Sequence, residues 1–210
     1  MSDQSFFGFL GLPDNTSDVN VMSFVARMAL KQHRTHVPVK IIAVHGGDVD
    51  SMPTVDVQIM VNQIDGQGNK TDHGVIYGIP VMRNQGGGSA VINDPAVGDV
   101  GAMHIMDRDI SALKANNGDQ SNPGSFRTGD LSDGVYYARM FSKDSPVQYI
   151  NFNGGKVVIV DQGGSTIIMD GGSVYVNPGG GMVYLGSADG SGCEFVVTLG
   201  GPSINVKAKV

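Results

Sequence analysis

The last third of the chain repeats a short unit in which a few apolar, mostly β-branched residues are followed by a pair of glycines. The glycine pairs stand at 154–155, 163–164, 171–172, 179–180 and 200–201. Successive pairs are eight or nine residues apart up to Gly180 and farther apart beyond it. A repeat of nearly fixed period predicts a stacked architecture in which each unit covers the next one.

Each unit predicts one β-strand and one corner, since glycine tolerates the positive φ that a tight corner needs. The apolar segments are 157–160, 166–169, 173–176, 182–185, 195–198 and 204–206. An eight-residue unit is too short for one coil of a three-faced single-chain β-helix, but it suits one face and one corner. We therefore expect three chains to intertwine as a trimeric β-helix, in which every strand pairs with strands of the other two chains.

Composition excludes several classes of protein. Glycine accounts for 31 of the 210 residues without a Gly-X-Y period, which excludes collagen. The net charge of −6 argues against a nucleic-acid partner, and the single Cys193 excludes a disulfide framework or a cysteine zinc site. The first residues lack a basic segment and no run reaches the length of a membrane span, so we expect synthesis in the cytoplasm without a signal peptide.

The middle of the chain predicts a small β-barrel. Apolar residues recur three and four apart from residue 19 to about 32, which predicts a helix capped by Ser17 or Asp18. Five short strand patterns follow between residues 39 and 106, and Pro80 predicts an edge or a bulge in the third. This pattern favours a Greek-key barrel of the OB type with a flanking helix. A long polar loop, 116–134, and an apolar stretch, 135–141, complete the domain.

The N-terminal peptide is apolar but interrupted by glycines. Its aromatic and aliphatic side chains are costly to leave in water, so we expect another chain to cover them. The candidate docking residues are Phe6, Phe7, Phe9 and Leu10. The predicted organisation is a docking peptide (1–18), an OB-fold-like domain with its helix (19–142) and a β-helical needle (143–210).

Several short motifs resemble a known family. They are Gly78–Val81, Gly86–Gly88, Pro95–Asp99, Met106–Ile110, and Arg127 with Asp130–Asp133. In this order they resemble the barrel domain of the central spike proteins that puncture membranes at the tip of contractile bacteriophage tails, particularly the phi92-like spike family. The resemblance covers residues 20 to 140 as a domain and 147 to 210 as the needle.

The resemblance implies a homotrimeric virion protein of the tail baseplate. The barrel would sit against the baseplate hub, which would also receive the N-terminal peptide, and the needle would make transient contact with the host outer membrane. Such spikes often end in an apex that holds iron through a His-X-His pair. This sequence has no histidine after His104, so we expect no metal and a separate protein capping the needle.

Candidate chemical groups favour a structural protein over an enzyme. His33 and His36 could share a helix face but have no third ligand nearby, and His104 is expected in the barrel wall. Asp107, Arg108 and Asp109 follow a strand, where caps and ion pairs are more common than catalytic groups. Glu194 is the only glutamate, which excludes a glycosidase based on two glutamates. We expect no cofactor.

Two kinds of ligand binding are alternatives to a purely structural role. Nucleic-acid binding needs basic and aromatic residues on one sheet face, and the strands offer only Lys40, Tyr77 and Arg83. The main alternative is a trimeric tail-fibre or adhesin fragment that binds a surface glycan. That role favours exposed aromatics on the needle, where Tyr175 and Tyr184 are the candidates.

Overall fold

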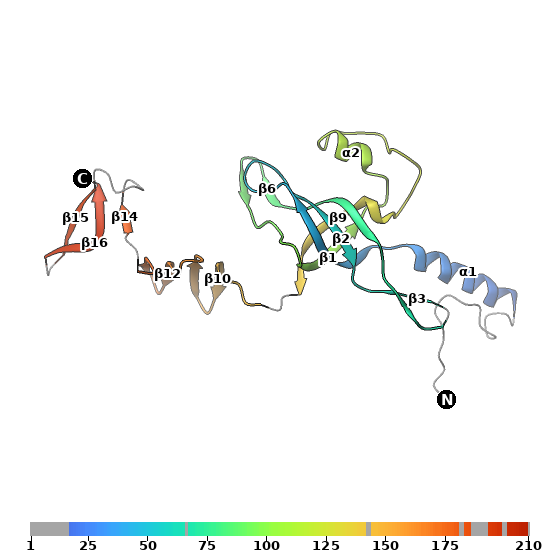
Figure 1. Ribbon diagram of the computed structural model, residues 1–210, viewed down its shortest axis with the longest axis horizontal. Helices are drawn as coiled ribbons and strands as arrows, with labels where there is room; N and C mark the ends of the chain where they lie inside the picture. Colours follow the sequence, from blue (N-terminus) through green and yellow to red (C-terminus); the bar gives the residue numbers. More distant parts are fainter. Residues whose placement is uncertain are drawn as a thin grey trace, which may run out of the picture. The chain divides into compact units, whose positions relative to one another are not determined.

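The computed structural model describes residues 17–65, 67–141, 144–180, 183–185, 193–198 and 201–209. The chain divides into two compact units, residues 1–142 and 143–210. Strands make up most of the regular structure in both units (Figure 1), which confirms the predicted all-β class.

The long helix of the described residues is α1 (Asp18–Gln32), as the spacing of its apolar residues predicts. Ser17 is the N-cap, because its Oγ accepts a hydrogen bond from the Asn20 amide at 3.3 Å. Val21, Phe24 and Met28 are half-buried, whereas Val19, Met22, Val25 and Leu30 are exposed. The helix therefore leaves much of its apolar surface uncovered in the single chain.

The first unit is built on one five-stranded antiparallel sheet with the order β5-β2-β1-β8-β9. Its strands are β1 (His36–His45), β2 (Thr54–Ile59), β5 (Val75–Pro80), β8 (Val100–Ile105) and β9 (Gly134–Phe141).

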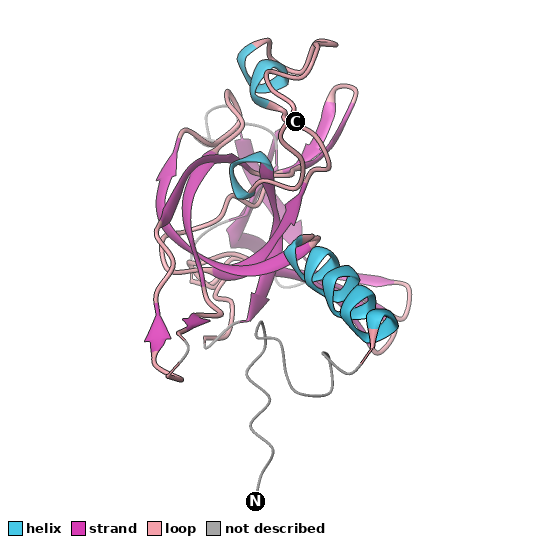
Figure 2. Ribbon diagram, turned by 90° about the vertical axis from the view of Figure 1, so that its right-hand side faces the viewer, coloured by secondary structure: helices cyan, strands magenta, loops and turns pink. Residues whose placement is uncertain are grey.

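The sheet closes on itself where β9 meets the end of β5. Val81 and Tyr136 form a parallel bridge, in which the Met82 amide donates to the Tyr136 carbonyl at 2.8 Å. The strands therefore form a ring in Figure 2. The strands β1, β2 and β5 pair in chain order. The next strand of the sheet, β8, pairs with β1 on its other side and not with β5, and β9 then pairs with β8. This is a Greek-key barrel of the OB type.

The barrel core comes from residues that alternate along the strands. In β2, Val55, Val57 and Ile59 point inward, whereas Val61 lies beyond the strand and is exposed. The core consists of Val39, Ile41, Val55, Val57, Ile59, Ile79, Val81, Met103, Ile105 and Tyr136.

A bulge lies in β5, two residues before Pro80. Val55 pairs with Ile79 while Val57 pairs with Ile76, so β5 carries one residue more than β2 at this point. Gly78 has φ +64 there, and its amide donates to Asp56 Oδ1 at 3.0 Å. The bulge expected from Pro80 is present.

Short elements lie in the connections between the barrel strands. Two small hairpins are β3 (Gln63–Ile64) with β4 (Lys70–Thr71), and β6 (Asn84–Gly86) with β7 (Ser89–Val91). The long loop between β8 and β9 contains the single-turn helix α2 (Ser111–Ala115) and the 3₁₀ turn η2 (Leu131–Asp133).

The second unit contains an antiparallel meander of four consecutive strands. They are β10 (Tyr149–Asn153), β11 (Lys156–Val160), β12 (Thr166–Asp170) and β13 (Ser173–Asn177). Gly154–Gly155 and Gly171–Gly172 form two of the three turns between these strands, and all four glycines have positive φ, from 57° to 84°. Such two-residue turns with positive φ at both positions close tight hairpins.

The structure describes one chain, so the pairing of needle strands with other chains stays a prediction, and within this chain β10 to β13 form a sheet of their own. These strands pair with one another within one chain, because each glycine pair folds a strand back onto its predecessor instead of directing it around a shared axis. A second sheet of the same unit has the order β14-β16-β15, with β14 (Val183–Leu185), β15 (Cys193–Thr198) and β16 (Gly201–Lys209).

Candidate functional site

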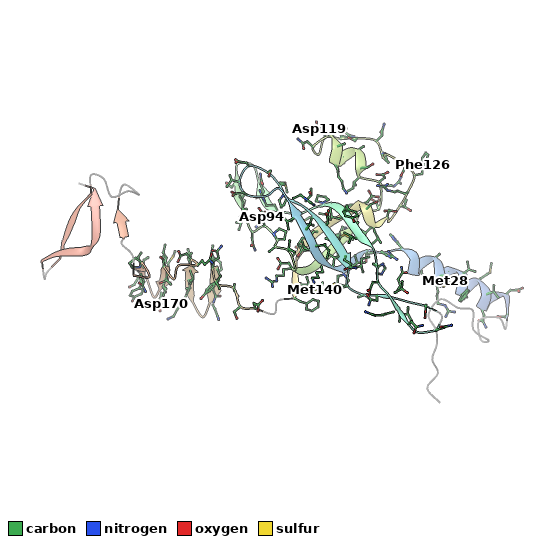
Figure 3. All side chains as sticks on the ribbon, viewed as in Figure 1. Met28, Asp94, Asp119, Phe126, Met140 and Asp170 are labelled. Carbon is green, nitrogen blue, oxygen red and sulfur yellow. The ribbon has the colours of Figure 1, made fainter. Side chains whose placement is uncertain are left out.

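A cavity of about 620 Å³ lies beside the point where the barrel closes. Its walls come from the segment that follows β5, from the segment that follows β7, and from β9. Asp94, on the segment after β7, is labelled in Figure 3. No local sequence pattern indicates this cavity, because its walls are distant in the chain and meet only when the barrel closes.

Arg83 and Asp94 form an ion pair in one wall of the cavity. Arg83 Nη2 donates to both Asp94 carboxylate oxygens, at 2.8 and 3.0 Å, and to the Ser51 carbonyl at 3.1 Å. The Arg83 side chain is only 4% exposed. Burial opposes ionisation of Asp94, but hydrogen bonds from Arg83 and from the Asp48 amide outweigh it and lower its pKa.

Two buried donors, Tyr136 Oη and Arg83 Nε, have no hydrogen-bond partner among the described residues. Tyr136 is 2% exposed, and burial, followed by the nearby Asp99 carboxylate, raises its pKa to about 12. A Cβ at Gly101 would overlap the Tyr136 hydroxyl, so glycine is needed there for the ring to lie against β8. Buried polar groups in folded proteins are normally paired, so these two require an explanation.

Arg127 ties together the beginning and the end of the long loop between β8 and β9. Its Nε and Nη2 donate to the two Asp133 carboxylate oxygens at 2.7 and 2.8 Å, and Nη2 also donates to Asp109 at 2.9 Å. Both aspartates are buried. We call Arg127, Asp109 and Asp133 the loop clamp.

The loop clamp decides the role of the aspartates near α2. Asp109 accepts hydrogen bonds from the Ser111 amide and the Ser125 hydroxyl, which with Arg127 lower its pKa to about 2. It therefore acts as a cap and an ion-pair partner, as expected, although its partner is Arg127 instead of the neighbouring Arg108. Phe126, labelled in Figure 3, stays fully exposed on the same loop.

His33 and His36 do not share a helix face, because α1 ends at Gln32 and His36 is the first residue of β1. His36 pairs with His104 across β1 and β8, and His104 Nδ1 lies 2.8 Å from His36 Nε2. His104 is thus in the barrel wall, as predicted. His45 Nε2 contacts Asp56 Oδ2 at 2.9 Å, and this hydrogen bond, followed by one from the Gly78 amide, lowers the Asp56 pKa. Within the described residues, no cluster of three or more such side chains is placed to hold a metal ion.

The meander has one wholly apolar face. Strand residues alternate between the two sides of a sheet, so the register places Val157 and Ile159 on one side and Val158 and Val160 on the other. The side that we call the apolar face carries Ile150, Phe152, Val157, Ile159, Ile167, Met169, Val174 and Val176.

The opposite side, which we call the mixed face, has a different chemistry. It carries an ion pair between Lys156 and Asp170, with asparagine, serine and threonine between the remaining apolar residues. On the apolar face, Phe152 is 78% exposed and Val174 is 64% exposed. The single chain therefore leaves a continuous apolar surface in contact with water.

The predicted docking residues Phe6, Phe7, Phe9 and Leu10 lie outside the described residues. Of the tyrosines considered for glycan binding, Tyr175 is exposed on the mixed face, and the side chain of Tyr184 is not described. Lys40 and Tyr77 are exposed, whereas Arg83 is committed to its ion pair. In the described part of the chain, no helix is both long enough and apolar enough to cross a bilayer.

Residues 37–138 match a family model described as the N-terminal domain of phage protein Gp138. The matched range begins in β1 and ends in β9, so it covers the barrel and the clamped loop. This similarity supports a phage structural protein of the baseplate type, carried in the virion. None of the curated proteins matches the chain.

Proposed function

We propose that the protein is the central spike of a contractile phage tail, a homotrimer that helps to pierce the host cell envelope. The observation that carries this proposal is the apolar face of the β10–β13 meander, which follows a barrel similar to a phage protein domain. A sheet with one apolar side needs a cover, and nothing in the described part of the second unit supplies one.

Copies of the same chain provide the simplest cover. Three meanders arranged around an axis would turn their apolar faces inward and their mixed faces outward, as the sides of a prism. Each copy would then supply one side at this level, a revision of the fully intertwined arrangement expected from the repeat. Closed cyclic symmetry would make the three contacts equivalent.

The work of this spike is mechanical, and it needs no active site. Energy for penetration would come from contraction of the tail, and the protein would contribute a stiff body with paired strands. We propose that the barrel and the N-terminal peptide bind the baseplate hub, and that a separate tip protein caps the needle. The fully exposed Phe126 and the exposed apolar residues of α1 suit such contacts.

The first experiment measures the mass of the purified full-length protein in solution by light scattering. We expect three times the chain mass, and resistance of the assembly to heat or detergent. A stable monomer at micromolar concentration would contradict the proposal, since the apolar face would then remain uncovered.

The second experiment tests assembly into the tail. Deleting residues 1–12 should leave the trimer intact but reduce its incorporation into phage particles, measured by complementation of a phage that lacks the gene. If the deletion prevents trimer formation, the peptide belongs to the fold and not to a docking contact.

A further inference from the structure

The barrel wall is joined by a single bridge where β9 meets the end of β5. Val81 and Tyr136 form this parallel bridge, and the Met82 amide donates to the Tyr136 carbonyl at 2.8 Å. Beyond the bridge, no backbone hydrogen bond among the described residues joins residues 82–84 to residues 137–139. The two stretches therefore separate at the point where a continuous sheet would carry on its ladder of hydrogen bonds.

The cavity of about 620 Å³ lies at this separation. Four consecutive residues of one stretch, 81–84, and four of the other, 136–139, are among the residues that line it. From Tyr137 onward β9 is exposed, and it pairs with β8 alone. We call the cavity and these two stretches the open seam.

The outer edge of β9 is suited to pairing with another strand. Free amide and carbonyl groups at a strand edge are a template for pairing, and proteins often protect such edges with charged side chains. Arg139 is the charged residue between positions 137 and 141, and it is paired with Asp99 at 3.3 Å. The large apolar side chains of this edge are between 52% and 63% exposed: Tyr137, Met140 and Phe141. Charge therefore does not protect this edge.

The side chains of the open seam favour a neutral segment. Arg83 is paired with Asp94 and Arg139 with Asp99, so an added charged side chain would stay unbalanced. The buried donors Tyr136 Oη and Arg83 Nε are covered by protein atoms and take no part in the contact. Apolar surface at the cavity comes from Met82, Val91, Pro95 and Tyr137.

A second copy of the barrel has no free strand of sufficient length. In the described part of the first unit, the strands outside the five-stranded sheet are two or three residues long, and each is paired within its own hairpin. The open seam extends over four residues on each side. An added strand is therefore expected from a different protein.

We propose that the open seam is the surface by which the barrel binds the baseplate hub, and that an extended segment of the hub protein enters it as an additional β-strand. This segment pairs through its main chain with the outer edge of β9 and with residues 82–84, which is recognition by strand addition. Its side chains are neutral, and those that enter the cavity are apolar. The inference rests on the proposed role in the tail and names the contact with the hub.

The main-chain test compares hydrogen exchange in the free full-length protein with exchange in the same protein within purified tails. Peptides that cover residues 82–84 and 137–139 should exchange at least about tenfold more slowly in tails, because their amides become hydrogen-bonded. Residues 116–122 of the long loop lie outside the open seam and serve as the reference. Equally fast exchange of the seam peptides in free protein and in tails would overturn the proposal.

Two adjacent residues of β6 provide a matched pair of variants. Asn84 and Gln85 are both exposed, but Asn84 lines the cavity and Gln85 does not. Asn84→Trp should fill the seam and lower incorporation into phage particles about tenfold, which corresponds to about 1.4 kcal/mol of lost binding. Gln85→Trp should be incorporated like the wild type, and both variants should keep the wild-type solution mass and melting temperature. Equal incorporation of the two variants would contradict the proposal.

The solution mass separates the remaining outcomes. Loss of the trimer in Asn84→Trp alone would show that another copy of the chain fills the seam, and the hub strand would be refuted. A wild-type protein that is monomeric or absent from tails would refute the proposed function itself. A wild-type trimer that is present in tails with unprotected seam amides would refute the strand addition alone.

Discussion

Two adjacent residues of β11 test the assignment of the apolar face. Ile159 lies on the apolar face between Ile150 and Ile167 on the neighbouring strands, whereas Val158 lies on the mixed face between Asn151 and Ile168. Both side chains are half-buried and β-branched. Ile159→Asp and Val158→Asp therefore form a matched pair with opposite expected outcomes.

The magnitude follows from the number of copies. If three apolar faces enclose a dry interior, Ile159→Asp places three carboxylates there, and each unpaired buried charge costs several kcal/mol. The total is on the order of 10 kcal/mol, which is comparable to the whole stability of a typical domain. Val158→Asp leaves its carboxylate at the outer surface and loses about 1 kcal/mol per chain of strand preference.

The assay compares the solution masses of the two variants by light scattering, followed by complementation of a phage that lacks the gene. We expect Ile159→Asp to yield monomer or aggregate and no infectious particles, and Val158→Asp to assemble. Because burial raises a carboxyl pKa, partial assembly of Ile159→Asp at mildly acidic pH would support the same reasoning. If both variants assemble equally well at neutral pH, the apolar face is not enclosed and the proposed spike is refuted. The reverse pattern would show that the mixed face is the inner one.

Three further predictions concern single groups. The loop clamp should weaken in acid, because the pKa of Asp109 is about 2 in the folded protein against 3.8 ordinarily. The stabilisation is complete above about pH 4 and is lost toward pH 2, and thermal melts across this range should show the loss. Ser125→Ala removes one of the leading hydrogen bonds to this carboxylate and should reduce the pH dependence. Tyr136 should make the barrel less stable as the pH rises from 10 to 12, because its pKa is raised in the folded state, and Tyr136→Phe should abolish that loss in melts at alkaline pH. Gly171→Ala should cost about 1 kcal/mol per chain in denaturant unfolding, since φ is +57 and the new Cβ would meet no atom within 4 Å, whereas Ser173→Ala in the same hairpin should have little effect.

The sequence predicts the strands β11, β12 and β13 of the second unit, but neither β10 nor the two faces of the sheet. Glycine pairs and β-branched residues define β11, β12 and β13 because turn and strand preferences are local. In β11, however, Val157, Val158, Ile159 and Val160 are all apolar, so the strand itself shows no alternation. The apolar face can be recognised only from the register, which places Asn151 and Lys156 on the opposite side of the sheet. Register depends on how the strands pair and cannot be derived from one strand alone.

The candidate sites were harder to predict, because they depend on contacts between distant segments. In the sequence Asp109 stands next to Arg108, but its ion-pair partner is Arg127, 18 residues away in the same long loop. Tyr136 fell within a stretch expected to be apolar, and nothing local shows that its hydroxyl has no partner. The barrel class was predictable from the number and spacing of short strands, although its closure through Val81 and Tyr136 was not.

The glycine hairpins of the meander have a mechanical consequence. Consecutive strands are stacked, and the hydrogen bonds between them run along the stacking direction. Tension in that direction would break the hydrogen bonds of one strand pair after another. Compression would instead push the paired strands together. A body built this way is suited to being pushed and poorly suited to being pulled. In the proposed spike, withdrawal from a membrane should therefore damage the meander more readily than entry.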